Sequence, residues 1–363
     1  MLIIGAMCLS LIACGVKSEP ETESTDAVVD AVNEESTGPI TITDQRGVTV
    51  EFDAVPTRIA ATIMPFPSIF CAVAGSAEKL VGINPSAMMA YEDSTLKHVF
   101  PELASAQTSW VDTSFTVNIE ELLLLEPDVV FQWTSQPEEI AKMEEVGLKV
   151  VALEYGDLED LQTWIHIIGT LLGVEERAEN LLKVFDENIE ESDAILAQIP
   201  EEEYINTISL TGDMKVAGVG FQAYWFEHSG AINPARELSG DATTVDMEQI
   251  YEWNPEVIYI GNFTEIMPED LFENTLDGQD WSSVAAVQNG QVYKIPIAGY
   301  RWDPPGVETP LMVKWMAKTH HSEYFADMDM REEITDFYKA IYEFDITDAM
   351  LDDILDDASK GIY

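Results

Sequence analysis

The sequence predicts an α/β fold of two similarly built lobes with parallel sheets, joined by a single long α-helix. Three observations predict this fold. Short apolar strands alternate with helical patterns along the chain, which is typical of parallel sheets that are covered on both faces. One stretch of the first half recurs in the second half, and a long amphipathic pattern lies between the two copies.

The first lobe is predicted over residues 40–172. Its opening stretch, "ITITDQRGVTVEF", has two alternating runs around "QRG" and predicts a β-hairpin. Short apolar runs then predict four strands, separated by helical patterns, at 58–63, 79–84, 128–133 and 149–154. A parallel sheet is therefore expected in this half.

An internal repeat predicts that the second lobe, residues 201–363, follows the same plan. The stretch "TVNIEELLLLEPDVVFQW" begins at Thr116 and "TVDMEQIYEWNPEVIYIG" begins at Thr244, and the two align without a gap. Each predicts a short helix that stops before a proline, Pro127 or Pro255, and then a buried strand. A further strand is predicted after each copy, at 149–155 and 291–297. Such a repeat predicts duplicated lobes.

A helix is predicted between the lobes, within residues 173–200. Leu181, Leu182, Phe185 and Ile189 recur at short helical steps with acids between them. A helix of about 25 residues would be roughly 37 Å long, which is enough to brace two lobes.

The N-terminus predicts export and a lipid anchor. Residues 1–14 form a short apolar run ending in "LIAC", with the length of a signal-peptide core rather than of a membrane span. "LIAC" resembles the lipobox of bacterial lipoproteins, in which the cysteine, here Cys14, becomes lipidated. No Lys or Arg precedes the run, and a buried N-terminal strand is the alternative. Residues 15–39 are rich in Glu, Ser and Thr and predict a disordered acidic tether. The folded part is thus expected outside the cytoplasm, anchored to the cell membrane.

Charge and cysteine content restrict the partners and the chemistry. The formal net charge of −49 argues against nucleic acid and against anionic lipid head groups. It indicates a solvated acidic surface or a saline habitat, with partner docking as the alternative. Of the three cysteines, only Cys71 would remain beside the lipidated one, so no intramolecular disulfide is expected. Its apolar surroundings predict a core position.

From about residue 40 to the C-terminus, the chain resembles the substrate-binding proteins of ABC importers for iron–siderophore complexes, haem and vitamin B12. This is the class III periplasmic-binding-protein family. The resemblance rests on the lipobox and tether, on "ITITDQRGVTVEFDAVPTRIA", "AVAGSAEKLVGI" and both repeat copies, and on the helix between the copies. It implies two Rossmann-like lobes, a cleft between them with little hinge bending, and a monomer that delivers cargo to a permease dimer.

The resemblance also implies docking residues. In the family, a glutamate on each lobe docks to arginines of the permease, and the matching residues here are Glu120 and Glu248. They coincide in the internal repeat. A Glu–Arg pair can be bidentate and charge-assisted. The alternative is that each glutamate is favoured only by the dipole at the start of its helix.

Ligand-binding residues are expected at the carboxyl ends of the strands. Aromatic faces suit a large flat or greasy ligand. Arg301, in "GYRWDPPG", suits an anionic group or, alternatively, pairs with Asp303. Core or rim packing is an equal alternative for the other aromatic residues. The predicted ligand-binding residues are Met64, Phe66, Tyr91, Trp133, Tyr155, Tyr224, Trp225, Tyr300, Arg301 and Trp302.

The predicted ligand is an iron(III)–siderophore or similar metal chelate, with haem, cobalamin and molybdate or tungstate as alternatives. No cofactor or resident metal is expected, because the sequence has no Cys/His cluster with metal-site spacing. The doublet His320–His321 is expected at the surface. No GxSxG, P-loop or HExxH motif occurs, so an enzyme is not expected. A cell-surface hydrolase is the alternative from a different functional class.

Overall fold

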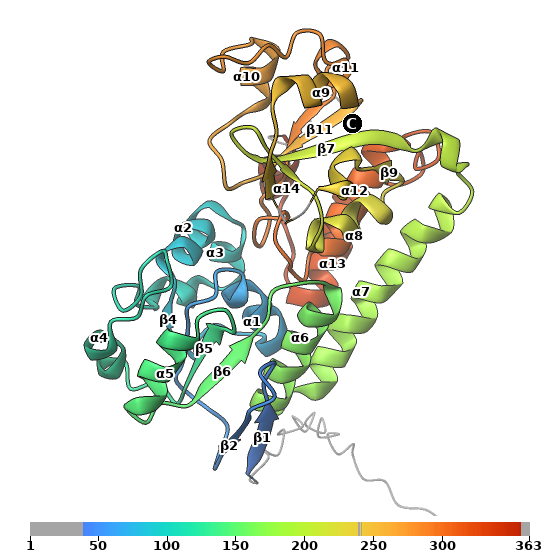
Figure 1. Ribbon diagram of the computed structural model, residues 1–363. Helices are drawn as coiled ribbons and strands as arrows, with labels where there is room; N and C mark the ends of the chain where they lie inside the picture. Colours follow the sequence, from blue (N-terminus) through green and yellow to red (C-terminus); the bar gives the residue numbers. More distant parts are fainter. Residues whose placement is uncertain (1–38, 239, 241, 357–363) are drawn as a thin grey trace, which may run out of the picture. The chain divides into compact units, whose positions relative to one another are not determined.

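The computed structural model describes residues 39–238, 240 and 242–356 (Figure 1). The predicted signal peptide with Cys14, and all but the last residue of the predicted tether, lie outside the described residues. None of the helices within the described ranges has the length and hydropathy needed to cross a membrane.

The N-terminal lobe begins with the predicted hairpin and contains a parallel sheet. Strands β1 (Ile40–Thr43) and β2 (Thr49–Phe52) pair antiparallel. The four-stranded sheet has the order β4-β3-β5-β6, and all its pairs are parallel. The hairpin and the four predicted strands are confirmed. The sheet strands are β3 (Ile59–Ala61), β4 (Leu80–Ile83), β5 (Val129–Trp133) and β6 (Val150–Leu153).

Helices cover both faces of this sheet, and every residue of β5 and β6 is therefore buried. Val130 and its neighbours on one face pack with α4 and α5, whereas Phe131 and its neighbours on the other face pack with α1, α6 and the later helix α7 (Glu175–Leu196). The continuous apolar strands in the sequence therefore reflect burial on two sides. The helices of this lobe are α1 (Phe66–Ala74), α2 (Pro85–Asp93), α3 (Leu96–Val99), α4 (Ile119–Leu124), α5 (Pro137–Glu145) and α6 (Leu158–Leu172).

The C-terminal lobe has a mixed sheet. Its order is β10-β8-β7-β11-β12, and the short β9 (Ala231–Ile232) pairs with β7. Strands β7, β9, β11 and β12 run parallel, whereas β8 turns back antiparallel to β7 and β10 pairs antiparallel to β8. The expectation of a parallel sheet thus holds for the centre of this lobe and not for its edge. The strands are β7 (Ile205–Gly212), β8 (Lys215–Ala217), β10 (Ala242–Thr244), β11 (Val257–Ile260) and β12 (Val292–Lys294).

The two copies of the repeat adopt the same local structure. Helix α4 and its counterpart α9 (Met247–Trp253) are each followed, within two residues of the helix end, by a residue with positive φ, 46° at Glu126 and 42° at Asn254. A proline follows each of these residues. The next backbone N–H, of Asp128 or Glu256, donates a 2.7 Å hydrogen bond to a carbonyl of the neighbouring strand segment. The predicted duplication, with a helix stop before each proline, is confirmed.

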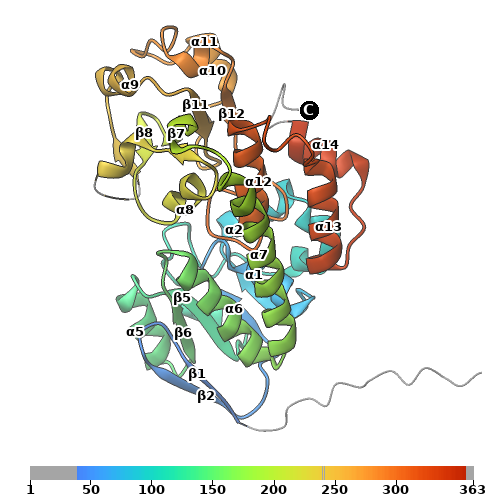
Figure 2. The ribbon, with the colours of Figure 1, turned by 90° about the vertical axis from the view of Figure 1, so that its right-hand side faces the viewer.

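Helix α7 (Glu175–Leu196) lies between the lobes and is 22 residues long, or about 33 Å at 1.5 Å per residue. Helices α12 (Thr309–His320) and α13 (Met330–Tyr342), from the end of the chain, pack against it (Figure 2). The Arg177 guanidinium of α7 donates to the carbonyl of Ala72 in α1 at 3.0 Å and to that of Ile341 in α13 at 2.8 Å. The buried Lys314 of α12 pairs with Glu191 of α7 at 2.8 Å. The largest hydrophobic cluster therefore contains residues of both lobes.

The remaining helices belong to the second half of the chain. They include two short ones that follow β11 and three longer ones at the C-terminal end. They are α8 (Phe221–Glu227), α10 (Pro268–Phe272), α11 (Ala285–Gln288), α12 (Thr309–His320), α13 (Met330–Tyr342) and α14 (Asp348–Asp356).

Candidate functional site

A cavity of about 440 Å³ lies between the two lobes. Both lobes contribute residues that follow their parallel strands, which is where ligands gather in α/β sheets. From the N-terminal lobe it is lined by Met64, Pro65, Phe115, Trp133, Thr134, Ser135, Glu154 and Tyr155. From the C-terminal lobe it is lined by Thr211, Gln222, Ala242, Phe263, Tyr300, Asp303 and Pro304.

The N-terminal wall of the cavity is aromatic. The Trp133 ring stands edge-on to Tyr155 (centroids 5.8 Å apart, planes at 87°) and to Phe115 (6.3 Å, 82°). Behind it lies Trp164, at 5.5 Å. Such contacts contribute about 0.5–1.5 kcal/mol each beyond burial, so this wall is held in shape by its own packing.

The C-terminal wall carries buried polar atoms. The Tyr300 hydroxyl, Thr211 Oγ1 and Gln222 Oε1 are buried and have no hydrogen-bond partner among the described residues. Burial raises the pKa of Tyr300 far above its usual range, and the neighbouring Arg301 charge opposes the shift. Tyr300 is therefore a neutral hydroxyl at any physiological pH.

Arg301 does not line the cavity. Its guanidinium lies 4.7 Å from the ring centroid of Phe263, which does line it. Within the described part of the chain, Arg301 forms no ion pair with Asp303 or any other acid, and its Nε has no partner. Asp303 instead accepts a 2.6 Å bond from the Asn262 backbone N–H. Burial raises the pKa of Asp303, and this N–H bond and the Arg301 charge lower it in part.

Trp302 follows Arg301 and was also predicted to contact the ligand, but its side chain is buried in the core. Its indole Nε1 donates to Glu308 at 3.0 Å, and the ring packs edge-on to Trp315. Its burial in the core explains why it is absent from the cavity lining.

Four other predicted contacts also lie away from the cavity. Phe66 is buried against Phe131, with ring centroids 4.3 Å apart. Tyr91 and Trp225 are buried in the core, and Tyr224 packs on His228 at 4.2 Å. The structure thus places Met64, Trp133, Tyr155 and Tyr300 together at the cavity, and places Phe66, Tyr91, Tyr224, Trp225, Arg301 and Trp302 elsewhere.

Several lining residues were missed from the sequence. Phe263 comes two residues after the repeat copy that ends at Gly261, so the rule that selected Trp133 would also have found it. Phe115, with a positive φ of 68°, and Gln222 come from loops and a helix start, where the sequence carries no strand-end signal.

The histidine doublet is buried, so the expectation of a surface position was wrong. His320 Nε2 lies 3.1 Å from the Tyr259 hydroxyl, and its Nδ1 lies 2.9 Å from the Ser229 carbonyl oxygen. Burial lowers the pKa of His320 to about 3. His321 contacts the Gly230 carbonyl at 2.9 Å. Both histidines bind backbone, and the described residues contain no group of three or more His, Cys, Asp and Glu placed to hold a metal.

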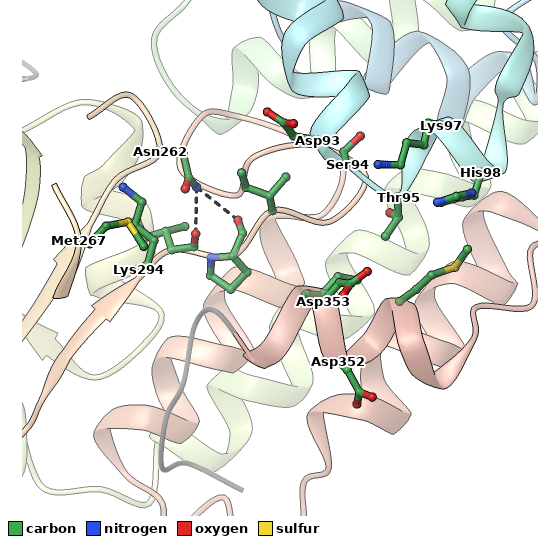
Figure 3. Close-up of a pocket in the computed structure, with 15 residues that line it drawn as sticks. Asp93, Ser94, Thr95, Lys97, His98, Asn262, Met267, Lys294, Asp352 and Asp353 are labelled. Carbon is green, nitrogen blue, oxygen red and sulfur yellow. Dashed lines mark hydrogen bonds between the residues drawn. The ribbon is translucent and has the colours of Figure 1, made fainter. Parts of the chain in front are cut away.

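A second cavity, of about 450 Å³, lies between the α2–α3 segment, the residues after β12, and α14 (Figure 3). Both cationic and acidic side chains line it, among them Lys97, Asp93 and Asp353. Asn262 lines it and donates to the carbonyls of Ile295 and Pro296. Its walls lack the aromatic cluster of the first cavity, so the first cavity is the stronger ligand site.

The two predicted docking residues lie outside both cavities. Glu120 and Glu248 are exposed, and each is the second residue of its helix, α4 or α9. The buried Cys71, in contrast, confirms its predicted core position.

A cavity between duplicated α/β lobes is the arrangement of a solute-binding protein, and comparison with known proteins agrees. The family model described as "Periplasmic binding protein" matches residues 68–298. The chain belongs to this family, whose members matched here are solute-binding proteins of ABC importers.

Individual relatives bind different solutes. The molybdate-binding protein MolA of Haemophilus influenzae is 26% identical over 251 residues, which cover 62% of this chain and 70% of MolA. The iron(3+)-hydroxamate-binding protein FhuD of Bacillus subtilis is 24% identical over 210 residues, which cover 53% of this chain and 64% of FhuD. A solved periplasmic solute-binding protein from Veillonella parvula is 37% identical, with a TM-score of 0.79 over 88% of this chain and 97% of that one.

Proposed function

We propose that this protein is an extracytoplasmic lipoprotein without enzymatic activity. It captures an iron(III)–siderophore or similar metal chelate in the cavity between its lobes and delivers it to the permease of an ABC importer. The observation that supports the ligand class best is the contrast between the two walls of the cavity. One wall is a cluster of aromatic rings, and the other carries buried hydroxyl and amide oxygens without partners.

Each wall suits a different part of such a ligand. The faces and edges of Trp133, Tyr155 and Phe115 suit an apolar or aromatic chelator body. A buried polar group without a partner costs about 1–3 kcal/mol, and donors and acceptors on a chelate would remove this cost at Tyr300, Thr211 and Gln222. A volume of about 440 Å³ lies within the usual range of small-molecule sites.

The alternative ligands are haem, cobalamin, and molybdate or tungstate. A tetrapyrrole would use the aromatic wall in the same way. Molybdate is supported by the relative MolA, which binds it. A tetrahedral oxyanion would, however, fill only a small part of the cavity and would leave the aromatic wall unused, so the chelate is the first choice.

Delivery is proposed to use Glu120 and Glu248 as docking residues for the two halves of a permease dimer. Both are exposed and occupy equivalent positions, and the overall negative charge favours a basic partner surface. Lipidation of Cys14 would keep the monomeric protein at the cell membrane. No resident cofactor or metal takes part.

A ligand screen tests this function. Ferric siderophores, haem, cobalamin, molybdate and tungstate are added to the purified protein, with sugars and amino acids as controls, and thermal unfolding and tryptophan fluorescence are measured. A saturable rise in Tm with a chelate, lost in Tyr155→Ala and reduced in Tyr300→Phe, is the expected result. If molybdate alone stabilises the protein, the proposed ligand is the oxyanion and not a chelate. Turnover of an ester or glycoside substrate would contradict the binding function.

A further inference from the structure

Two exposed apolar side chains occupy equivalent positions in the two lobes. Leu123 in α4 is 43% exposed and Tyr251 in α9 is 42% exposed, and these residues coincide in the internal repeat. The residues just before them, Leu122 and Ile250, are both fully buried. Single exposed apolar residues need no explanation. Among the large apolar residues exposed in the described chain, however, this is the only pair that the repeat aligns.

Each of these side chains lies one helical turn after a proposed docking glutamate. Glu120 and Leu123, like Glu248 and Tyr251, are three residues apart, so they are neighbours on the same helix surface, with Cβ atoms about 5–6 Å apart. We call Glu120 with Leu123, and Glu248 with Tyr251, the paired patches. The Tyr251 hydroxyl donates a 2.6 Å bond to the Asp280 carbonyl, and the residue remains 42% exposed.

On each lobe, a paired patch follows a cavity-lining residue closely in the chain. Glu120 follows the lining residue Phe115 by five residues, and Glu248 follows the lining residue Ala242 by six. At no more than about 3.6 Å per residue, their Cα atoms are within roughly 18 and 22 Å of those residues. Val117, just before α4, also bonds at 2.9 Å to Glu139 in the first turn of α5. The start of α4 therefore lies at the cavity edge of the sheet.

We propose that the paired patches form a two-point docking surface for the importer permease, in which apolar contact by Leu123 and Tyr251 holds the complex and the glutamates steer it. This inference rests on the proposed function and adds an apolar component to it. The permease would place a cation opposite each acid, with apolar surface beside it. Equivalent patches on duplicated lobes suit a partner with two equivalent halves.

The net charge of the chain favours the permease, rather than a second copy of this chain, as the partner that binds the paired patches. Two copies with a net charge of −49 each would repel one another, most strongly where acids are exposed. A basic partner surface would instead be attracted from a distance.

The two components of the docking surface predict different kinetic signatures. Exposed charge pairs at an interface rim act mainly on the association rate and its salt dependence. Buried apolar anchors act mainly on the dissociation rate. Removal of both apolar side chains is thus expected to weaken docking without changing its response to salt.

The test measures binding of immobilised protein to the cognate importer in nanodiscs, at low and high salt. Leu123→Ala with Tyr251→Ala is expected to raise the dissociation rate about tenfold or more. Tyr251→Phe keeps the ring and should bind as the wild type does. Met89→Ala with Phe272→Ala removes two exposed apolar side chains, one from each lobe, and is the matched control. Glu120→Ala with Glu248→Ala should slow association and flatten the salt dependence.

The outcomes separate the inference from the function on which it rests. If the glutamate variant loses docking and the Leu123/Tyr251 variant binds normally, the apolar component is wrong and the docking role of the acids stands. If the glutamate variant binds normally, the proposed docking itself is wrong. If the wild type self-associates in sedimentation and the Leu123/Tyr251 variant does not, the occupant is a second copy, and the inference is overturned. Thermal unfolding confirms that each variant is folded.

Discussion

Glu308 is the buried acid that holds the loop 299–306 in place. Its carboxylate accepts hydrogen bonds from the Gly299 backbone N–H at 3.0 Å, from Trp302 Nε1 at 3.0 Å and from the Tyr342 hydroxyl at 3.2 Å. The side chain is almost fully buried, and burial raises its pKa. Since Tyr300 lies between two of these anchored residues, Glu308 fixes the backbone on both sides of this residue of the polar wall.

Two substitutions of Glu308 are expected to differ sharply in their effect. Glu308→Ala leaves three buried donors without an acceptor, at about 1–3 kcal/mol each, so the free energy of unfolding should fall by at least about 3 kcal/mol. Glu308→Gln keeps one oxygen for Gly299 and Trp302, and its NH₂ can donate to the Tyr342 hydroxyl, which then acts as acceptor. Its cost should be that of about one altered hydrogen bond, near 1 kcal/mol.

Urea unfolding, followed by tryptophan fluorescence and circular dichroism, measures both losses, and the ligand found in the screen measures the effect on the cavity. We expect Glu308→Gln to bind that ligand nearly as the wild type does, and Glu308→Ala to bind it more weakly. A loss below about 1 kcal/mol for Glu308→Ala would show that the bonds to Glu308 do not hold this loop. Equal losses for the two variants would show that charge, rather than hydrogen bonding, is what the site requires.

Three further predictions concern the cavity and the core. The pKa of His320 is about 3 in the folded state and about 6.5 in the unfolded state, so the unfolded state binds one more proton as the pH falls. Between pH 7 and pH 5, the free energy of unfolding of the wild type, measured by urea titration, should therefore fall by about 2 kcal/mol more than that of His320→Gln. Arg301→Ala should weaken an anionic chelate about tenfold in calorimetry, with Arg301→Lys intermediate because it keeps the charge and loses the planar stack on Phe263; unchanged affinity in both variants would exclude any role for Arg301. Trp133→Phe should remove most of the ligand-induced fluorescence quenching while leaving binding measurable, since Trp133 is the tryptophan that lines the cavity; quenching as in the wild type would place the ligand elsewhere.

The main strands and helices could be predicted from the sequence because their residues follow simple periodicities. Strands buried on both faces read as continuous apolar runs, and β3 to β6 lie where those runs occur. The repeat predicted α9 and β11 from α4 and β5. The edge of the C-terminal sheet could not be predicted this way, because β8 and β10 have only three residues each. They are also antiparallel additions, β8 to β7 and β10 to β8, and the four-stranded sheet of the first lobe has no such edge.

Side-chain placement was less predictable, because position in the chain does not determine which way a ring points. Phe66 and Met64 both follow β3, but Met64 lines the cavity whereas Phe66 begins α1 and packs into the core. His320 looked like a surface residue because a polar doublet rarely fits a core. Its two ring nitrogens are in fact both matched by buried partners, a pairing that only the tertiary fold creates.

The point at which the repeat breaks down explains how duplicated lobes form unlike cavity walls. Trp133 of the first copy corresponds to Gly261 of the second. A Cβ at Gly261 would lie 2.9 Å from Asp303 Oδ2, so the glycine leaves room for a carboxyl group where the first lobe has an indole. The aligned positions Leu123 and Tyr251 have instead kept an exposed apolar character. Under the proposed function this difference is expected. A chelate with an apolar body and polar groups is matched by unlike walls, whereas a dimeric permease presents the same surface twice and is matched by like patches on the two lobes.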